Sequence, residues 1–431
     1  MYQKEVGTTD AAQVVTLAIF IISYILIFSG KFERTTAALL GVFIMVTCGY
    51  LFGFMNFEEV LGFVDWEVII LLFGMMTYVG IMAKTGFFKY LGIRAIRLSK
   101  GKPWLIFLYL SLITTFISMI IDNVTTILLI IPITVELAEM LEINPIPVML
   151  GEAVLSNIGG VGTMIGDPPN IMIGIASAHT FNEFIIHLFP PVLTALLFSV
   201  ILSRIIYRKW LAGESKHIEE LMKREPWRYL KNKKKMRYLL YILAGMILFF
   251  ALEGVTGISP SFVALAGGTL ALFASMEDPR EAFKSVEWST LVFFIALFSL
   301  VGGLHEVGLL SSLAEWLLSI SGSTVILALI ILWVSGISSS FVDNIPITAA
   351  LIPVISIMAE GYHSDIFWWA LAMGVGMGGN ITPIGSSAGV ITLSLSKRYG
   401  HEIHTRDWLM FGTVMGIVGM VICSVFLFMM A

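Results

Sequence analysis

Apolar runs long enough to cross a lipid bilayer recur from one end of this chain to the other. The first covers residues 11–29, and similar runs follow near 36–54, 67–83 and 187–206. A helical span needs about 20 apolar residues, and only helices and closed barrels satisfy all their backbone hydrogen bonds in lipid. Only 13% of the residues are charged, against about 25% in soluble domains. We therefore expect an all-α polytopic membrane protein.

Three sequence blocks occur twice, in the same order. The dipeptide Asp122-Asn123 in ISMIIDNVTTILLIIPI corresponds to Asp343-Asn344 in SSSFVDNIPITAALIPV. Upstream, VDWEVIILLFGMMTYVG matches VEWSTLVFFIALFSLVG, and downstream GGVGTMIGDPPN matches GGNITPIGSSAG. Matching blocks in one order indicate an internal duplication. We predict three segments: a first repeat over 1–205, a cytoplasmic basic linker over 206–237 and a second repeat over 238–431.

Each repeat is predicted to hold about five spans plus a re-entrant hairpin and a broken helix. The hairpin follows from two apolar arms that meet at the Asp-Asn dipeptide without a loop. Five crossings are an odd number, so the repeats must be inverted relative to each other. Because cytoplasmic loops collect Lys and Arg, this can be tested: with both termini outside, every basic residue except Lys4 falls on the inner side. We expect a multi-pass protein of the cell (plasma or inner) membrane.

The stretch NIGGVGTMIGDPPNIMIG at residues 157–174 interrupts a helix at membrane depth. Its glycines permit open backbone conformations, and Pro168 and Pro169 forbid continuation of the preceding helix. Non-helical backbone is tolerated in a membrane only where it lines a cavity or packs in protein. GGNITPIGSSAG, with Pro383, is the counterpart. Broken helices in inverted halves are the sequence pattern of a secondary transporter with a midplane site.

Ionisable groups inside membrane segments are costly and mark functional sites by default. We assign ion or proton coupling to Asp122, Asn123, Asp343, Asn344, Glu152 and Asp167. A Na⁺ ion at Asp122, Asn123, Asp343 and Asn344 is the one cofactor considered. Helix capping by the paired aspartates is the structural alternative, although Ser or Thr would cap at lower cost in lipid.

The neutral polar residues around the hairpins and breaks form the predicted substrate site. They are Thr125, Asn157, Thr163, Gly166, Asn170, Thr348, Asn380, Thr382, Ser386 and Ser387. The repeats differ in acidic residues, since Asp167 corresponds to Ser386 and Glu152 to Leu371. Asp343 is therefore expected to be the cleaner test of coupling, because its half lacks a second acid. No Walker A motif supports ATP hydrolysis on this chain.

At these motifs the chain resembles a known family. DNVTTILLIIPIT followed by NIGGVGTMIGDPPN is similar to the ion transporter superfamily branch of arsenite permeases, NhaD-type sodium/proton antiporters and the P protein (pink-eyed dilution), and closest to the P-protein-like group. The resemblance covers essentially the whole chain. It implies a homodimer in which each protomer combines a scaffold with a moving transport part, working by an elevator mechanism.

The expected function is secondary active transport of a small inorganic solute, coupled to H⁺ or Na⁺. The solute would be an oxyanion or metalloid of the arsenite or silicate type, or a related anion. One alternative is a Na⁺/H⁺ antiporter without another solute. An intramembrane aspartyl hydrolase is the alternative from another class, since two aspartates can share a proton and activate water. Matching helix breaks in both repeats disfavour an enzyme, and no nucleic-acid partner is expected.

Overall fold

A computed structural model describes residues 10–29, 31–213, 215–216, 218–223 and 225–430. This part of the chain folds into helices and contains no strand. Nine of its helices are long and apolar enough to cross a membrane. The predicted all-α polytopic class is confirmed, while Lys4 lies outside the described residues.

The helices of the first repeat are α1 (Asp10–Phe28), α2 (Arg34–Phe52), α3 (Phe57–Phe63), α4 (Trp66–Lys84), α5 (Phe87–Ser99), α6 (Pro103–Ser118), α7 (Asn123–Met140), α8 (Ile146–Gly160), α9 (Pro168–Ser177) and α10 (Phe181–Ile206). The next segment holds α11 (Arg208–Leu211), α12 (Ile218–Lys223) and the 3₁₀ turn η1 (Pro226–Tyr229).

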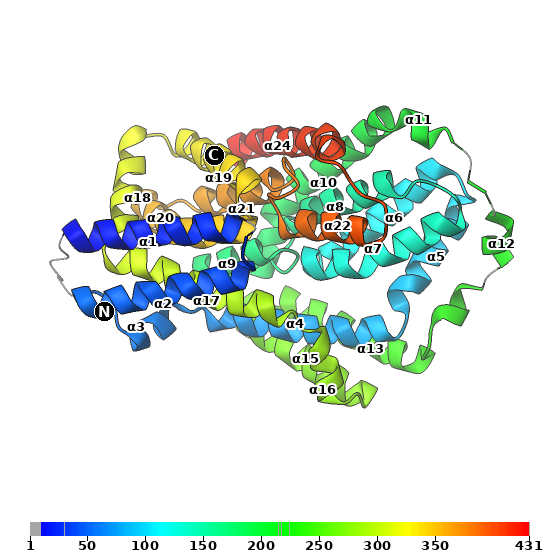
Figure 1. Ribbon diagram of the computed structural model, residues 1–431, viewed down its shortest axis with the longest axis horizontal. Coiled ribbons are helices and arrows are strands. Elements are labelled where there is room, and N and C mark those ends of the chain that lie inside the picture. Colours follow the sequence, from blue (N-terminus) through cyan, green and yellow to red (C-terminus); the bar gives the residue numbers. More distant parts are fainter. Residues whose placement is uncertain (1–9, 30, 214, 217, 224, 431) are drawn as a thin grey trace.

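The helices of the second repeat are α13 (Lys233–Ala251), α14 (Glu253–Thr256), α15 (Pro260–Ser275), α16 (Pro279–Ala282), the 3₁₀ turn η2 (Phe283–Ser285), α17 (Trp288–Glu306), α18 (Leu309–Ile320), α19 (Thr324–Phe341), α20 (Asn344–Tyr362), α21 (Ile366–Gly378), α22 (Ser387–Arg398), α23 (Thr405–Trp408), the π-helical turn η3 (Leu409–Thr413) and α24 (Val414–Met430). Helix α1 begins and α24 ends in the left half of Figure 1, and α11 and α12 lie on the right.

Both hairpins return to the side from which they start. For the hairpin of α6 and α7, the Gly101 carbonyl accepts a hydrogen bond from the Ser215 hydroxyl at 2.6 Å. The Leu141 carbonyl accepts one from the Lys216 amide at 2.9 Å. The open ends of both arms therefore meet the same linker segment. In the hairpin of α19 and α20, the Tyr362 hydroxyl donates to the carbonyl of Ser321 at 2.8 Å. Each pair of arms therefore forms a helical hairpin, as the sequence predicts.

Contacts of one repeat recur in the other with the partners exchanged. A Cβ atom on Gly80 of α4 would lie 1.8 Å from the hydroxyl of Ser285, which precedes α17. A Cβ atom on Gly302 of α17 would lie 2.4 Å from the ring of Phe63, which precedes α4. Gly80 corresponds to Gly302 in the duplicated sequence, and Phe63 corresponds to Ser285. Helices α4 and α17 thus pack against each other's leading segments.

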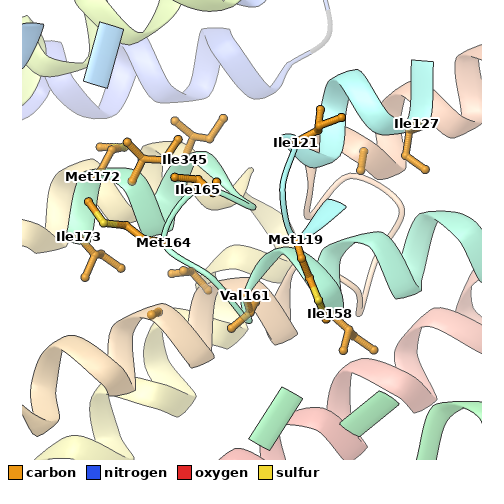
Figure 2. Close-up of a cluster of buried hydrophobic side chains, with 14 of the residues drawn as sticks. Met119, Ile121, Ile127, Ile158, Val161, Met164, Ile165, Met172, Ile173 and Ile345 are labelled. Atoms are coloured by element: carbon orange, nitrogen blue, oxygen red, sulfur yellow. The ribbon is translucent and has the colours of Figure 1, made fainter. Parts of the chain in front are cut away.

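Each helix break is held against the turn of its own hairpin. The Thr163 hydroxyl donates to the carbonyl of Met119 at 2.5 Å, and the Thr382 hydroxyl donates to the carbonyl of Ser340. Gly166 leaves no room for a side chain, because a Cβ atom there would lie 2.7 Å from a carbonyl of α6. Apolar side chains from the hairpin turn and the first break pack together (Figure 2). Hairpin turn and helix break therefore form one packed unit in each repeat.

The predicted orientation can be tested by labelling. Gly361 and Lys233 lie on opposite sides of the predicted map, and a Cβ atom on Gly361 would meet nothing within 4 Å. In a background without Cys48 and Cys423, we expect a membrane-impermeant maleimide to label Gly361→Cys in intact cells and Lys233→Cys only after lysis. Labelling of position 233 in intact cells would reverse the map.

The contact between α4 and α15 depends on glycine. A Cβ atom on Gly74 would lie 2.5 Å from the backbone of Ala264. Gly74→Ala should therefore lower the stability by about 1–3 kcal/mol through overpacking, seen as a lower melting temperature in detergent. Gly245→Ala in α13 is the matched control, since a Cβ atom there meets nothing within 4 Å. Equal melting temperatures for the two variants would contradict the tight packing.

Candidate functional site

Four helices begin at one place in the centre of the molecule. Helices α7 and α20 start at the two hairpin turns, and α9 and α22 start after the two helix breaks. The residues preceding these helices are Asp122, Asp343, Asp167 and Ser386. Helix N-termini carry partial positive charge and free N–H groups. This convergence favours negatively charged or oxygen-rich groups at the centre, as the sequence predicted for the half-helices.

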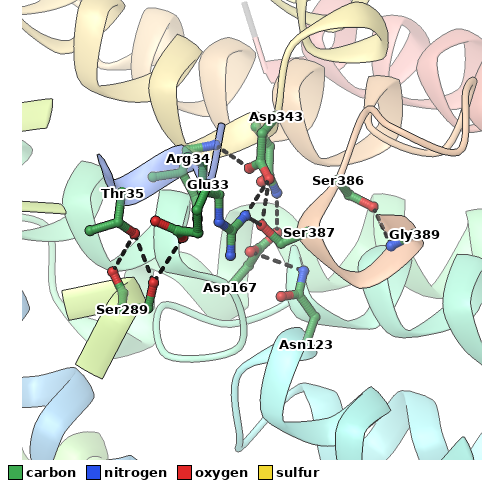
Figure 3. A network of polar contacts seen from close by, with 12 residues as sticks. Glu33, Arg34, Thr35, Asn123, Asp167, Ser289, Asp343, Ser386, Ser387 and Gly389 are labelled. Carbon is green, nitrogen blue, oxygen red and sulfur yellow. Dashed lines mark hydrogen bonds and ion pairs between the residues drawn. The ribbon is translucent and has the colours of Figure 1, made fainter. Parts of the chain in front are cut away.

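Asp167 joins the two hairpin tips. Its Oδ1 accepts a hydrogen bond from the Asn123 amide at 3.1 Å, and its Oδ2 accepts one from the Asn344 amide at 3.1 Å (Figure 3). Asn123 and Asn344 are equivalent residues of the two repeats, whereas Asp167 belongs to the first helix break. Because both oxygens accept from N–H donors, this carboxylate is satisfied in its ionised form.

A chain of amides continues from this carboxylate into the second break. The Asn157 Oδ1 accepts from Asn123 at 3.0 Å. The Asn157 amide nitrogen donates to the Asn380 Oδ1 at 3.0 Å and to the Ser386 hydroxyl at 2.7 Å. The Asn380 amide nitrogen is buried and has no partner. A buried N–H group without an acceptor is rare in folded proteins. Asn380 therefore offers a free hydrogen-bond donor to a ligand.

The amide chain breaks the internal symmetry. Asn157 corresponds to Gly376 in the second repeat, and Asn380 corresponds to Val161 in the first. A Cβ atom on Gly376 would lie 2.1 Å from a methyl group of Val161. One side of the symmetry axis therefore holds a hydrogen-bonded Asn–Asn pair, and the mirrored side holds a Val–Gly contact.

Asp343 is paired with an arginine. Its Oδ2 lies 3.4 Å from the Arg34 Nη1 and accepts a hydrogen bond from the Ser387 hydroxyl. Arg34 also donates to the Ser387 hydroxyl at 2.9 Å, and its guanidinium lies 5.4 Å from the centroid of the Phe293 ring. Arg34 begins α2, so this ion pair ties α2 to the second hairpin and the second break.

Asp122 has no such partner. Its Oδ1 accepts from the backbone amide of Thr125 at 2.9 Å, as a helix cap. Its Oδ2 and the Thr125 hydroxyl are buried without a hydrogen-bond partner. In the part of the chain that the structure describes, no ion pair includes Asp122. A buried carboxylate oxygen without a donor is costly, and a proton or a cation would satisfy it.

Arg34 was not among the residues predicted for the site. The sequence placed it in an inner loop, where basic residues are expected on topological grounds alone. Its position as the first residue of a span, directly after Glu33, is the one available signal. Burial and the charge of Asp122 raise the pKa of Glu287, which precedes α17, and the charge of Arg34 lowers it.

Several residues predicted for the site hydrogen-bond to the surrounding backbone and not to the central network. The hydroxyls of Thr163 and Thr382 are committed to backbone carbonyls of the hairpin turns. The Asn170 amide donates to the carbonyls of Val161 and Thr163, both at 2.9 Å. These residues satisfy the carbonyl groups that the helix break frees, as the absence of water in a membrane requires.

Glu152 and Thr348 also lie outside the central hydrogen-bond network. The Glu152 Oε1 accepts from the Thr134 hydroxyl at 2.6 Å, and its Oε2 is buried without a partner. The Thr348 hydroxyl donates to the carbonyl of Asn344, one turn back in α20. Asp167 instead serves both hairpin tips through its contact with Asn344. The half containing Asp343 lacks a second acid in sequence, as expected, but Asp167 of the other half reaches its hairpin tip.

Comparison with known proteins agrees with this architecture. A family model described as "Citrate transporter" (CitMHS) matches residues 24–374. The chain belongs to the citrate transporter family. This bears out the resemblance to the ion transporter superfamily.

Similar proteins align with nearly the whole of this chain. A "46 kDa membrane protein" of Mycobacterium leprae is 34% identical over 426 residues, covering 96% of this chain and 98% of the relative. An uncharacterized transporter of Mycobacterium tuberculosis is 34% identical with the same coverage. The human P protein is 29% identical over 96% of this chain and 59% of its own length.

A solved structure shows the same fold. The YdaH transporter of Alcanivorax borkumensis, described as having an unusual topology, aligns with a TM-score of 0.58 over 96% of this chain and 97% of the other. Its sequence identity is 13%. The family and the spans make the chain a multi-pass membrane transporter of the citrate transporter and P-protein type.

The two central aspartates are expected to differ in their contribution to stability. In Asp167→Asn, one of the two amides from Asn123 and Asn344 would face another N–H₂ group, which should cost roughly 2 kcal/mol. In Asp122→Asn, the amide oxygen still caps Thr125, so the change should stay below about 1 kcal/mol. Melting temperatures in detergent measure both. Asp122→Asn destabilising as much as Asp167→Asn would contradict the hydrogen-bond assignment.

Proposed function

We propose that this chain is a secondary active transporter of a small inorganic solute, coupled to H⁺ or Na⁺. The solute is an oxyanion or metalloid of the arsenite or silicate type, or a related anion. The observation that carries the proposal is the convergence of four helix N-termini from two hairpins and two broken helices. A secondary transporter builds its midplane site in this way.

Asp122 is the proposed site of cation coupling. Asp167 and Asp343 already have donors on both oxygens, from two asparagine amides and from Arg34, Ser387 and the Ile345 amide. The Asp122 Oδ2 has none. A proton or Na⁺ at this atom, beside the Thr125 hydroxyl, would supply the missing partner. The Glu152 Oε2 is also buried without a partner, but Glu152 lies outside the central network, so we assign coupling first to Asp122.

Arg34 and Asn380 are the proposed contacts for the solute. Arg34 presents a guanidinium and Asn380 a free amide donor at the helix N-termini, and both suit oxygen atoms of a ligand. The cluster brings one arginine against three aspartates, so a solute with little negative charge fits it better than a polyanion such as a tricarboxylate. The family description favours citrate as the second candidate.

An elevator cycle in a homodimer is proposed from the family resemblance. In such a cycle the hairpins and broken helices move against α1–α4 and α13–α17. The Arg34–Asp343 pair spans the two parts, so it must break during movement. Competition between a solute anion and Asp343 for Arg34 would link binding to release of the moving part.

The rival functions make different demands on the same residues. A Na⁺/H⁺ antiporter needs Asp122 but no solute at Arg34 or Asn380. A hydrolase needs two carboxylates that share a proton around a water. In this cluster Asp167 and Asp343 are each bound to donors of their own, which supports transport without bond cleavage. The relatives named as transporters point the same way.

Coupling can be tested in proteoliposomes loaded with a pH-sensitive dye. We expect uptake of arsenite or silicate to follow an imposed H⁺ or Na⁺ gradient in the native protein. In Asp122→Asn, uptake driven by the gradient should fall at least about tenfold, because the ionisable partner is lost while the cap is kept. Asn144→Asp, on the exposed turn before α8, is a control for a changed charge elsewhere.

The same assay separates the alternatives. Citrate uptake without arsenite or silicate uptake would replace the proposed solute class. A Na⁺-driven pH change with no solute at all would establish the antiporter. Unchanged gradient dependence in Asp122→Asn would overturn the coupling role and leave Asp122 as a helix cap.

A further inference from the structure

Two arginines line a cavity at the end of the molecule that carries the linker. The cavity has a volume of about 270 Å³ and is lined by Trp104, Arg204, Arg208, Leu211 and Ala212. Arg204 and Arg208 are one turn apart, in the last turn of α10 and the start of α11. The Arg204 guanidinium lies 5.3 Å from the centroid of the Trp104 ring at the start of α6. The central transport site uses none of these residues.

Among the described residues, neither Arg204 nor Arg208 forms an ion pair or a hydrogen bond with an acidic side chain. Two acids at the end of α7 and just after it are engaged elsewhere: Glu142 pairs with Lys216 at 2.9 Å, and Glu139 lies 3.4 Å from His401. Guanidinium groups bind phosphate in a planar, two-point geometry. Two unpaired guanidiniums around one cavity therefore present a site for a phosphate group.

An apolar strip leads away from the cavity along α10. Leu197 is 56% exposed, Ile201 58% and Ile205 63%. Helical spacing of three or four residues places Leu197, Ile201 and Arg204 on one face of α10, and Arg208 follows at the start of α11. A ligand that follows this face would have a phosphate at one end and hydrocarbon along the strip. A free phosphate ion would leave the apolar strip uncovered, so it fits this face less well than a ligand that carries a hydrocarbon chain.

We propose that Arg204, Arg208 and Trp104 bind the headgroup of an anionic phospholipid, with its acyl chains along the exposed face of α10. Basic residues next to a membrane span attract anionic lipids at the membrane surface. Tryptophan is enriched at that depth, where its ring contacts both apolar and polar groups. The Arg204–Trp104 contact holds the guanidinium at the headgroup level. This site is independent of the solute and of the coupling ion.

The test is lipid binding to the purified, delipidated protein by native mass spectrometry. Phosphatidylglycerol is the anionic probe, and phosphatidylcholine is the zwitterionic one. We expect the native protein to retain phosphatidylglycerol preferentially. Arg204→Gln with Arg208→Gln should weaken this binding roughly 30-fold, the loss expected for two surface arginines facing an anionic lipid. Lys209→Gln is the matched control, because Lys209 is an exposed neighbour that does not line the cavity.

Three results would overturn the proposal. The double variant could retain phosphatidylglycerol like the native protein, or phosphatidylcholine could bind equally well. Glycerol phosphate could displace phosphatidylglycerol at equal concentration, which would make the site one for soluble phosphate. Melting temperatures without added lipid show whether the double variant is folded. If it is not, the exposed single variant Arg208→Gln is compared with Lys209→Gln in the same way, and equal binding by the two would count against the site.

Discussion

The hydrogen bonds of Asp167 with Asn123 and Asn344 hold the centre of the molecule together. Neither hairpin turn can exchange its polar groups with water at this depth, so each must find a partner inside the protein. One carboxyl group accepts from both asparagine amides, in a setting where such bonds are strong because the local dielectric is low. The tips of two hairpins, more than 200 residues apart in sequence, are therefore held together by a residue of the first helix break.

The hairpins and helix breaks were predictable because their causes are local. A cluster of glycines with a following proline prevents a continuous helix at each break, whereas isolated prolines such as Pro132 stay inside a helix. Two arms without a loop must turn back. The roles of single residues depend on contacts between repeats, which one sequence does not reveal. Asn157 and Asn380 were recognised as site residues, but their direct pairing was not. Arg34 was missed since a basic residue near a span end has an ordinary topological explanation, and only the packing of α2 places it on Asp343.

The polar residues of the hairpin turns and helix breaks fall into two groups, those that bond to the backbone and those with an atom left without a partner. Thr163, Thr382 and Asn170 satisfy carbonyl groups that the lost helical bonds leave free. Without these hydrogen bonds, the non-helical backbone would leave buried carbonyl groups without a donor, which costs free energy in lipid. Among the described residues of the hairpin turns and breaks, the Asp122 Oδ2, the Thr125 hydroxyl and the Asn380 amide nitrogen are buried without a partner. The turns and breaks together thus supply both satisfied backbone groups and a small set of unsatisfied atoms for ligands.

The exchange of Asn157 and Asn380 for Gly376 and Val161 across the axis has a consequence for stoichiometry. A duplicated chain that kept its symmetry would present two equal sets of donors and hence two equal binding places per protomer. Here the amide pair fills one side, and a methyl group closes the other. Under the proposed function, each protomer would therefore offer the solute one amide-lined place and not two. A side chain at position 376 would lie 2.1 Å from the Val161 methyl group, so an asparagine can enter that side only if position 161 holds a smaller residue.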